Sequence, residues 1–312
     1  MTGGRPVVLV GQPLLEPLLP VLLASYDAVP LWEEEGRRRS GEARAVVWAG
    51  EFPLSAALLD TLPQLGLIAC FTVGYDGVDL AEATRRGIAV THAADANAED
   101  VADHAMGLML SHRRGIVEGD RLLRAGLWTA GPERLSRSMA RARLGIVGMG
   151  HIGQAVARRA EAMRMEISWW GPRNKPHLLW PRAESLTALA QGSDILLVAA
   201  RADGSNRGLI NADVMEALGP EGLLVNVARG QLVDEDALRQ ALRQRTLGGA
   251  ALDVFQQEPT PASIWADAPN CVLTPHMGGA THEAVARMAG MVLANLEAFF
   301  TGKALPNPVP PL

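Results

Sequence analysis

The stretch RLGIVGMGHIGQAVARRAEAM, residues 143–163, constrains the fold more than any other part of this chain. A short apolar run of β type leads into Gly148, Gly150 and Gly153, and a good helix former follows. In such a strand–turn–helix unit the first glycine makes the tight turn and the second lets the backbone approach a pyrophosphate. The third lets helix and strand pack closely, and the helix N-terminus offers free N–H groups to phosphate. The stretch predicts dinucleotide binding; a glycine-rich turn in another kind of α/β protein is the alternative.

Strand and helix patterns alternate along the rest of the chain, which indicates parallel sheets with crossover helices. The strands expected before the glycine motif are 7–10, 28–32, 45–48, 67–70 and 88–91. The strands expected from the motif onward are 144–147, 167–170, 195–198, 223–227, 250–254 and 272–273. A full α/β unit therefore precedes the dinucleotide unit, and its simplest role is to bind the substrate. We expect an α/β protein of two Rossmann-like, doubly wound parallel-sheet domains with a cleft between them.

The composition argues against several classes of function. A net charge of −5 and a pI of about 5.8 indicate no affinity for nucleic acid or an anionic membrane. No apolar stretch reaches the roughly 18 residues of a membrane span, and the N-terminus lacks a signal-peptide pattern. Cys70 and Cys271 have no metal-ligand spacing and are expected to be buried, reduced thiols. We therefore expect a cytoplasmic protein that holds no metal and acts on a small molecule.

The end of the second strand of the dinucleotide unit indicates which coenzyme binds. In an NAD-binding fold an acidic residue, about 20 residues beyond the glycines, bonds the ribose 2′-OH. Gly171 and Pro172 stand there in this chain, and Arg173, Asn174 and Lys175 follow. A carboxylate would repel a 2′-phosphate, whereas an arginine holds one with two charge-assisted hydrogen bonds. The stretch predicts NADP(H); a solvated basic loop is the alternative.

Three chemically distinctive side chains follow neighbouring strands of the same expected sheet. Arg229 comes after one apolar strand, Glu258 after the next, and His276 after the last. An arginine at this edge is suited to grip a carboxylate and polarise a carbonyl. A histidine beside a carboxylate is a general acid/base pair, because the carboxylate fixes the ring tautomer and favours the protonated form. Alone, Arg229 would be a surface side chain and His276 a structural one; together they predict catalysis.

These residues resemble the D-isomer-specific 2-hydroxyacid dehydrogenases over nearly the whole chain. The resemblance is strongest at TVGYDGVD (72–79), GMGHIG (148–153), NVARGQLVDEDAL (226–238), ALDVFQQEP (251–259) and LTPHMGGAT (273–281). Several spaced motifs in the right order are far more specific than any one of them. The basic residues after the second strand resemble the NADPH-dependent glyoxylate/hydroxypyruvate reductase branch of that family.

The resemblance implies roles for individual residues. Arg229, Glu258 and His276 would be the catalytic triad, and the backbone N–H groups of Val73 and Gly74 would hold the substrate carboxylate beside Arg229 and His276. Asp253 would contact the nicotinamide carboxamide. The coenzyme contacts that we expect are Gly148, Gly150, His151, Ile152, Gly153, Arg173, Asn174, Lys175, Ala228, Asp253 and Gly278.

The resemblance also implies discontinuous domains that close on the substrate. Residues 1–97, completed by 284–312, would form the substrate domain, and residues 98–283 the dinucleotide-binding domain. A homodimer would form through the long helix and the arm near residues 128–138. Whether Arg134 or a neighbour enters the partner's active site stays open.

Some positions depart from the family pattern or remain ambiguous. The loop 198–210 differs from the usual proline- and threonine-containing one, which puts coenzyme contacts there in doubt. Residues 48–50 follow a strand of the first domain and would shape the substrate pocket, although Trp48 fits a core position equally well. His104 and His112 lie in a helical pattern and are expected to be structural.

The expected activity is NADPH-dependent reduction of small 2-oxo acids, glyoxylate and hydroxypyruvate first, to D-2-hydroxy acids, with His276 as general acid. A reductase for a bulkier 2-oxo acid, such as an aryl pyruvate, is one alternative. A dinucleotide-sensing binding protein without turnover is another, which the intact Arg, Glu and His argue against. Formate or phosphite oxidation on the same scaffold is a third, which the basic loop and the short chain disfavour.

Overall fold

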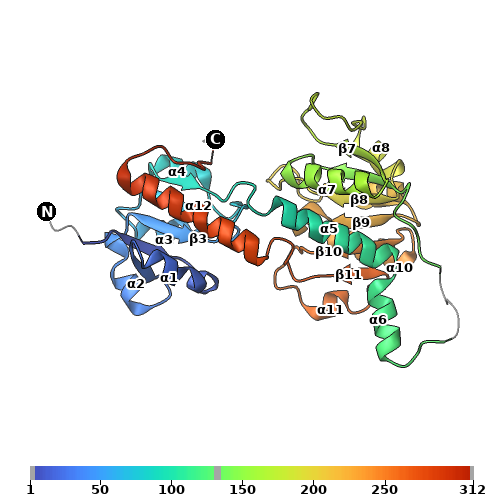
Figure 1. Cartoon of the computed structure of the whole chain (residues 1–312), viewed down its shortest axis with the longest axis horizontal. Helices are drawn as coiled ribbons and strands as arrows, with labels where there is room; N and C mark the ends of the chain where they lie inside the picture. Colours follow the sequence, from blue (N-terminus) through green and yellow to red (C-terminus); the bar gives the residue numbers. More distant parts are fainter. Residues whose placement is uncertain (1–3, 130–134, 310–312) are drawn as a thin grey trace. The chain divides into compact units, whose positions relative to one another are not determined.

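The computed structural model describes residues 4–129 and 135–309. The chain divides into two compact units, one of residues Met1–Asn97 with His282–Leu312 and one of residues Ala98–Thr281. The chain returns to the first unit at His282, two residues before the boundary expected from the sequence. Each unit is built on its own parallel β-sheet (Figure 1).

The first unit contains a five-stranded sheet in the order β2-β1-β3-β4-β5. Its strands are β1 (Val7–Val10), β2 (Asp27–Pro30), β3 (Ala45–Trp48), β4 (Leu67–Cys70) and β5 (Ala89–Thr91). Its helices are η1 (Pro13–Leu18), α1 (Leu19–Leu22), α2 (Glu34–Arg38), η2 (Ser40–Glu42), α3 (Ala56–Asp60), α4 (Leu80–Arg85) and α12 (His282–Thr301). Apolar side chains of η1, α1 and α12 pack on one face of the sheet, and those around α3 and α4 pack on the other.

Helix α12 is long and apolar enough to span a membrane by length and composition alone, contrary to the expectation from the sequence that no segment would be. It has 20 residues, and its most apolar window has a mean hydropathy of 1.2. In this fold one of its faces joins the apolar core of the first unit, because Ala284, Met288, Val292 and Leu296 recur every four residues and are buried.

The second unit contains a six-stranded sheet in the order β11-β10-β9-β8-β6-β7. Its strands are β6 (Arg143–Val147), β7 (Glu166–Trp170), β8 (Ile195–Val198), β9 (Leu223–Asn226), β10 (Gly249–Leu252) and β11 (Cys271–Leu273). Its helices are α5 (Ala98–Arg113), α6 (Ile116–Arg124), α7 (His151–Ala162), α8 (Leu186–Gln191), α9 (Ala212–Leu218), η3 (Gly230–Leu232), α10 (Glu235–Gln244) and α11 (Ala262–Trp265).

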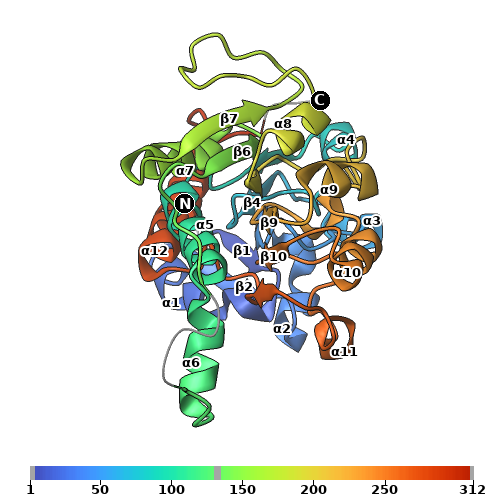
Figure 2. The same ribbon diagram turned by 90° about the vertical axis from the view of Figure 1, so that its right-hand side faces the viewer.

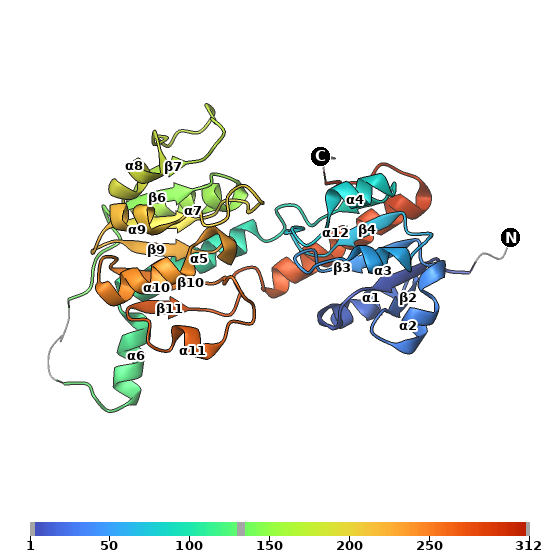
Figure 3. The same ribbon diagram turned by 180° about the vertical axis from the view of Figure 1, so that it is seen from behind.

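Helices cover both faces of this sheet, as Figure 3 shows, with α5 and α7 on one face and α8, α9 and α10 on the other. The strand order reverses at β6, because β7 lies on one side of it and β8 on the other. Ligands of open α/β sheets bind at the carboxyl ends of the strands beside such a switch point. The topology therefore assigns the binding edge of the second unit to the loops after β6, β7 and β8.

The predicted fold class is confirmed, with two parallel-sheet α/β domains. Helix α6 was not predicted from the sequence; it lies in the segment between the long helix and the glycine unit (Figures 1 and 2). Gly115, with φ of +63°, separates α6 from α5. Helix α6 is amphipathic in sequence but buries no residue. The segment after β1 forms η1 followed directly by α1, with Pro17 inside the 3₁₀ turn.

Candidate active site

The glycine turn after β6 is packed tightly on two sides and open on a third. Gly148 has φ of +93°, and a Cβ there would lie 2.5 Å from the Cα of Ala200. A Cβ on Gly153 would lie 2.3 Å from the oxygen of Gly148, so strand and helix meet only because both residues are glycine. Gly150, the N-cap of α7, has no atom within 4 Å of its Cβ position. The open side of the turn fits the approach of a pyrophosphate.

The loop after β7 supplies cations beside this turn. Lys175 donates a hydrogen bond of 2.7 Å from Nζ to the carbonyl oxygen of Met149, within the turn itself. Arg173 and Asn174 are exposed, and neither side chain donates a hydrogen bond within the described parts of the chain. Arg173 therefore has its guanidinium available for a ligand, in a loop that Lys175 ties to the glycine turn.

His276 and Glu258 form a short hydrogen-bonded pair. Nδ1 of His276 lies 2.5 Å from Oε2 of Glu258, and Oε1 of Glu258 accepts a 2.8 Å hydrogen bond from the N–H of Phe255. Burial by itself would raise the pKa of Glu258, but these two hydrogen bonds and the charges of His276 and Arg229 hold it below its ordinary value. Glu258 is therefore a carboxylate at neutral pH, as a partner that steadies a protonated imidazole requires.

The three predicted catalytic residues come from loops that follow adjacent strands, β9, β10 and β11. Arg229 is held by its own loop: Asn226, which is 1% exposed, accepts from the N–H of Ala228 and donates to the carbonyl oxygen of Arg229. Asn226 was not among the predicted site residues, although a polar residue at the end of an apolar strand was a signal for it.

Asp253 organises the loop that carries His276. Its Oδ1 accepts from the hydroxyl of Thr274 (2.6 Å) and the N–H of Met277 (3.0 Å), and its Oδ2 accepts from the N–H of Gly278 (2.8 Å). Its carbonyl oxygen accepts from the N–H of His276, which lies in the left-handed region with φ of +50°. The same buried residue thus fixes both ends of the turn around the imidazole.

The predicted carboxylate loop belongs to the first unit. Thr72 Oγ1 accepts from the N–H of Gly50 and donates to the carbonyl oxygen of Gly74, and His92 Nδ1 lies 2.9 Å from the carbonyl oxygen of Val73. The N–H groups of Val73 and Gly74 donate no hydrogen bond within residues 4–129 and 135–309. With the carbonyl groups occupied and the amides available, the loop suits an anionic ligand.

The remaining expected residues are distributed as follows. His151 is exposed on the first turn of α7, Ile152 is half-buried, and Ala228 and Gly278 are buried. Trp48 is 5% exposed and belongs to the core of the first unit.

Cys70 and Cys271 are free; Cys70 is buried as expected, whereas Cys271 is only partly buried, and burial raises the pKa of each thiol to about 12. Arg134 lies outside the described residues. Within the described ranges no group of three or more His, Cys, Asp or Glu side chains is arranged to hold a metal ion.

Residues 106–278 match the family described as "D-isomer specific 2-hydroxyacid dehydrogenase, NAD binding domain". The chain belongs to the D-isomer-specific 2-hydroxyacid dehydrogenases. This is a family of oxidoreductases, as the sequence motifs predicted.

Similar proteins include reductases of several 2-oxo acids. A glyoxylate/hydroxypyruvate reductase of Arabidopsis thaliana is 42% identical over 85% of each chain. A hydroxyphenylpyruvate reductase of Plectranthus scutellarioides is 43% identical over 85% of each chain. The solved NADPH-dependent glyoxylate/hydroxypyruvate reductase of Sinorhizobium meliloti, in complex with NADP and malonate, is 35% identical and superposes with a TM-score of 0.90 over 98% of this chain and 97% of that one.

Acid should loosen the loop around His276 through Asp253. Burial disfavours the charge of Asp253, but hydrogen bonds from His104, Thr274 and two backbone amides outweigh it and lower the pKa to about 2. A depressed pKa contributes stability above the unfolded value, near 4, and this contribution is lost as the pH falls toward 2. Asp253→Asn should therefore lower the free energy of unfolding by about 2 kcal/mol at pH 7.

Denaturant titrations of the wild type and of Asp253→Asn between pH 7 and pH 3 measure this difference, which should shrink as the pH falls. Glu184→Gln, at an exposed position of the same unit, is the control and should not alter the pH dependence. A difference that stays constant down to pH 3 would contradict the role assigned to the Asp253 carboxylate.

Proposed function

We propose that this protein reduces small 2-oxo acids to D-2-hydroxy acids with NADPH, and that glyoxylate and hydroxypyruvate are its leading substrates. The observation that carries the proposal is the 2.5 Å pair of His276 and Glu258, on loops beside the one that holds Arg229. This is the arrangement of a proton donor, its carboxylate partner and an anion-binding cation. A dinucleotide sensor would have no use for the first two.

His276 is the general acid of the proposed reaction. Its Nδ1 is engaged by Glu258, so Nε2 is the atom that gives a proton to the substrate carbonyl oxygen. Glu258 steadies the imidazolium before that transfer, and Arg229 grips the substrate carboxylate and polarises the carbonyl. In the first unit, the amides of Val73 and Gly74 are proposed to bind a substrate carboxylate.

The glycine turn and the loop after β7 hold the coenzyme in this proposal. Gly150 leaves room for the pyrophosphate, Arg173 binds the 2′-phosphate, and Lys175 adds a second positive charge beside the turn. Asp253 would bind the nicotinamide carboxamide. Bound NADPH would supply the hydride that the carbonyl carbon receives.

Arg173→Ala should raise the KM for NADPH by about 10-fold or more and change the KM for NADH little, because only NADPH carries the phosphate. Steady-state rates at varied coenzyme concentration measure both constants. Arg164→Ala, exposed at the opposite end of β7, is the matched control and should alter neither. Equal effects of Arg173→Ala on the two coenzymes would exclude the phosphate contact.

His276→Gln should lower kcat for glyoxylate reduction by roughly 10²–10⁴-fold, since it removes the proton donor. Glu258→Gln should have a smaller effect in the same direction. NADPH binding, followed by the coenzyme's fluorescence, should remain near the wild-type affinity in both variants, which separates lost chemistry from lost folding. A His276→Gln protein with nearly full activity would show that the proton comes from another group.

A bulkier 2-oxo acid is the second candidate substrate, because the hydroxyphenylpyruvate reductase is as similar to this chain as the glyoxylate/hydroxypyruvate reductase. Glyoxylate, hydroxypyruvate and 4-hydroxyphenylpyruvate compared by kcat/KM distinguish the two. The highest value for the aryl acid would replace the leading substrates and leave the reaction class unchanged.

We further propose that the protein is a homodimer in which a second copy covers α6. Helix α6 buries no residue and exposes Val117 and Leu123 at 53% and 59%, and Trp128 beyond it is 78% exposed. Exposed apolar residues grouped in this way are typical of an interface between subunits.

Replacing Leu123 and Trp128 together by Glu should convert the dimer to a monomer, because the charges would be buried in the interface. Sedimentation at micromolar concentration measures this. Leu179→Glu, at a position 97% exposed in the loop after β7, is the control and should leave the dimer intact. A dimer that survives the double substitution would exclude this surface.

A further inference from the structure

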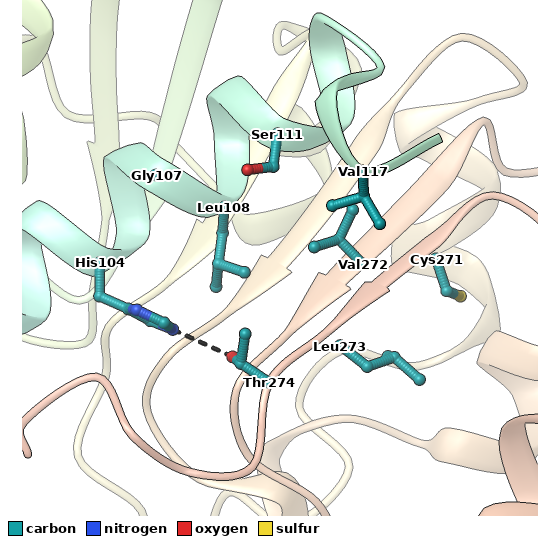
Figure 4. Close-up of a pocket in the computed structure, with 9 residues that line it drawn as sticks. All are labelled: His104, Gly107, Leu108, Ser111, Val117, Cys271, Val272, Leu273 and Thr274. Atoms are coloured by element: carbon teal, nitrogen blue, oxygen red, sulfur yellow. Dashed lines mark hydrogen bonds between the residues drawn. The ribbon is translucent and has the colours of Figure 1, made fainter. Parts of the chain in front are cut away.

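His104, on α5, reaches the network that holds the His276 loop. Its Nε2 lies 3.0 Å from Oγ1 of Thr274 and 3.2 Å from Oδ1 of Asp253. Figure 4 shows the ring of His104 directed from the helix toward Thr274. The two side chains also line a cavity of about 330 Å³ between α5, α6 and β11. From its place in a helical pattern, His104 was expected only to be structural.

The hydrogen-bond donors and acceptors of Thr274 and Asp253 determine which form of the His104 ring fits between them. Thr274 has one hydroxyl hydrogen, and its oxygen is 2.6 Å from Oδ1 of Asp253 but 3.5 Å from the carbonyl oxygen of Leu252. The hydrogen therefore goes to Asp253, which leaves the Thr274 oxygen as an acceptor. His104 must then carry a hydrogen on Nε2. Otherwise the lone pair of Nε2 would face the oxygens of Thr274 and Asp253, both of which act as acceptors there.

The same network extends to the loop beyond Thr274. A Cβ on Gly278 would lie 2.9 Å from Oδ2 of Asp253 and 3.2 Å from Cδ2 of His104, so the glycine lies directly against both side chains. The loop also contains His276, whose N–H donates to the main-chain oxygen of Asp253. A rotation of the Asp253 carboxylate would break its hydrogen bonds with Thr274, Met277 and Gly278, which hold the loop on both sides of His276.

We propose that His104 is a positioning residue for the reduction: its Nε2–H orients Asp253 and Thr274, and through them holds the 274–278 loop and His276 in place. This inference rests on the proposed function for its effect on turnover. The ordering of the loop is a property of the protein without coenzyme or substrate.

A pair of variants separates the N–H donor from the bulk of the ring. His104→Gln keeps an N–H donor on a side chain that reaches toward Thr274, whereas His104→Leu keeps apolar volume and removes the donor. The adjoining cavity gives both side chains room. His104→Leu should lower kcat with glyoxylate and NADPH by about 10-fold, the effect of one lost buried hydrogen bond. His104→Gln should restore most of that loss.

Hydrogen exchange of the Met277 and Gly278 amides in the protein without ligands gives a readout that does not depend on turnover. Exchange should be about 10-fold faster in His104→Leu and near the wild-type rate in His104→Gln. Melting temperatures of the two variants identify any general loss of folding.

Two results would overturn the inference. One is unchanged exchange of both amides in His104→Leu. The other is an equal loss of activity in the Gln and Leu variants at equal stability, which would indicate a purely structural side chain. Wild-type protein that turns over no 2-oxo acid would refute the proposed function instead, and the exchange measurement would still decide whether His104 orders the loop.

Discussion

The buried carboxylate of Asp253 is the interaction on which the candidate site depends. A charge removed from water is costly unless hydrogen bonds replace its hydration. The hydroxyl of Thr274 and the N–H groups of Met277 and Gly278 meet that demand, and in doing so they close the turn that carries His276. The strained, left-handed backbone of His276 persists because these bonds determine its surroundings. The position of His276, the proposed proton donor, is thus a consequence of satisfying a neighbouring charge.

Two groups of loops lie along the carboxyl edge of the six-stranded sheet, and each suits a different ligand. At the switch point, the loop after β6 contains the tight glycine turn and the loop after β7 contains the exposed Arg173. Both suit a phosphate-bearing coenzyme. Strands β9, β10 and β11 lead into the loops of Arg229, Glu258 and His276, which suit a 2-oxo acid. Parallel strands make this division possible, since all their carboxyl ends lie at the same edge.

Much of this was predictable from the sequence because it depends on local patterns. Glycine spacing predicted the turn at Gly148, and apolar runs predicted strands that end just before Arg229 and His276. The contacts of His104 were not predictable, because it meets Thr274 from a helix 170 positions away in the chain. Helix α6 was missed for a different reason: its amphipathic pattern covers only nine residues, and it contacts α5 without burying any residue of its own.

The most direct test of the proposed reaction is the initial rate of coenzyme oxidation by the purified protein with glyoxylate, measured in parallel with NADPH and NADH. We expect rapid oxidation of NADPH and little oxidation of NADH. Rapid oxidation of NADH alone would contradict the role of Arg173 while preserving the reaction. No oxidation of either coenzyme with glyoxylate, hydroxypyruvate or an aryl pyruvate would contradict the assignment of His276 and Glu258 as a working acid and its partner.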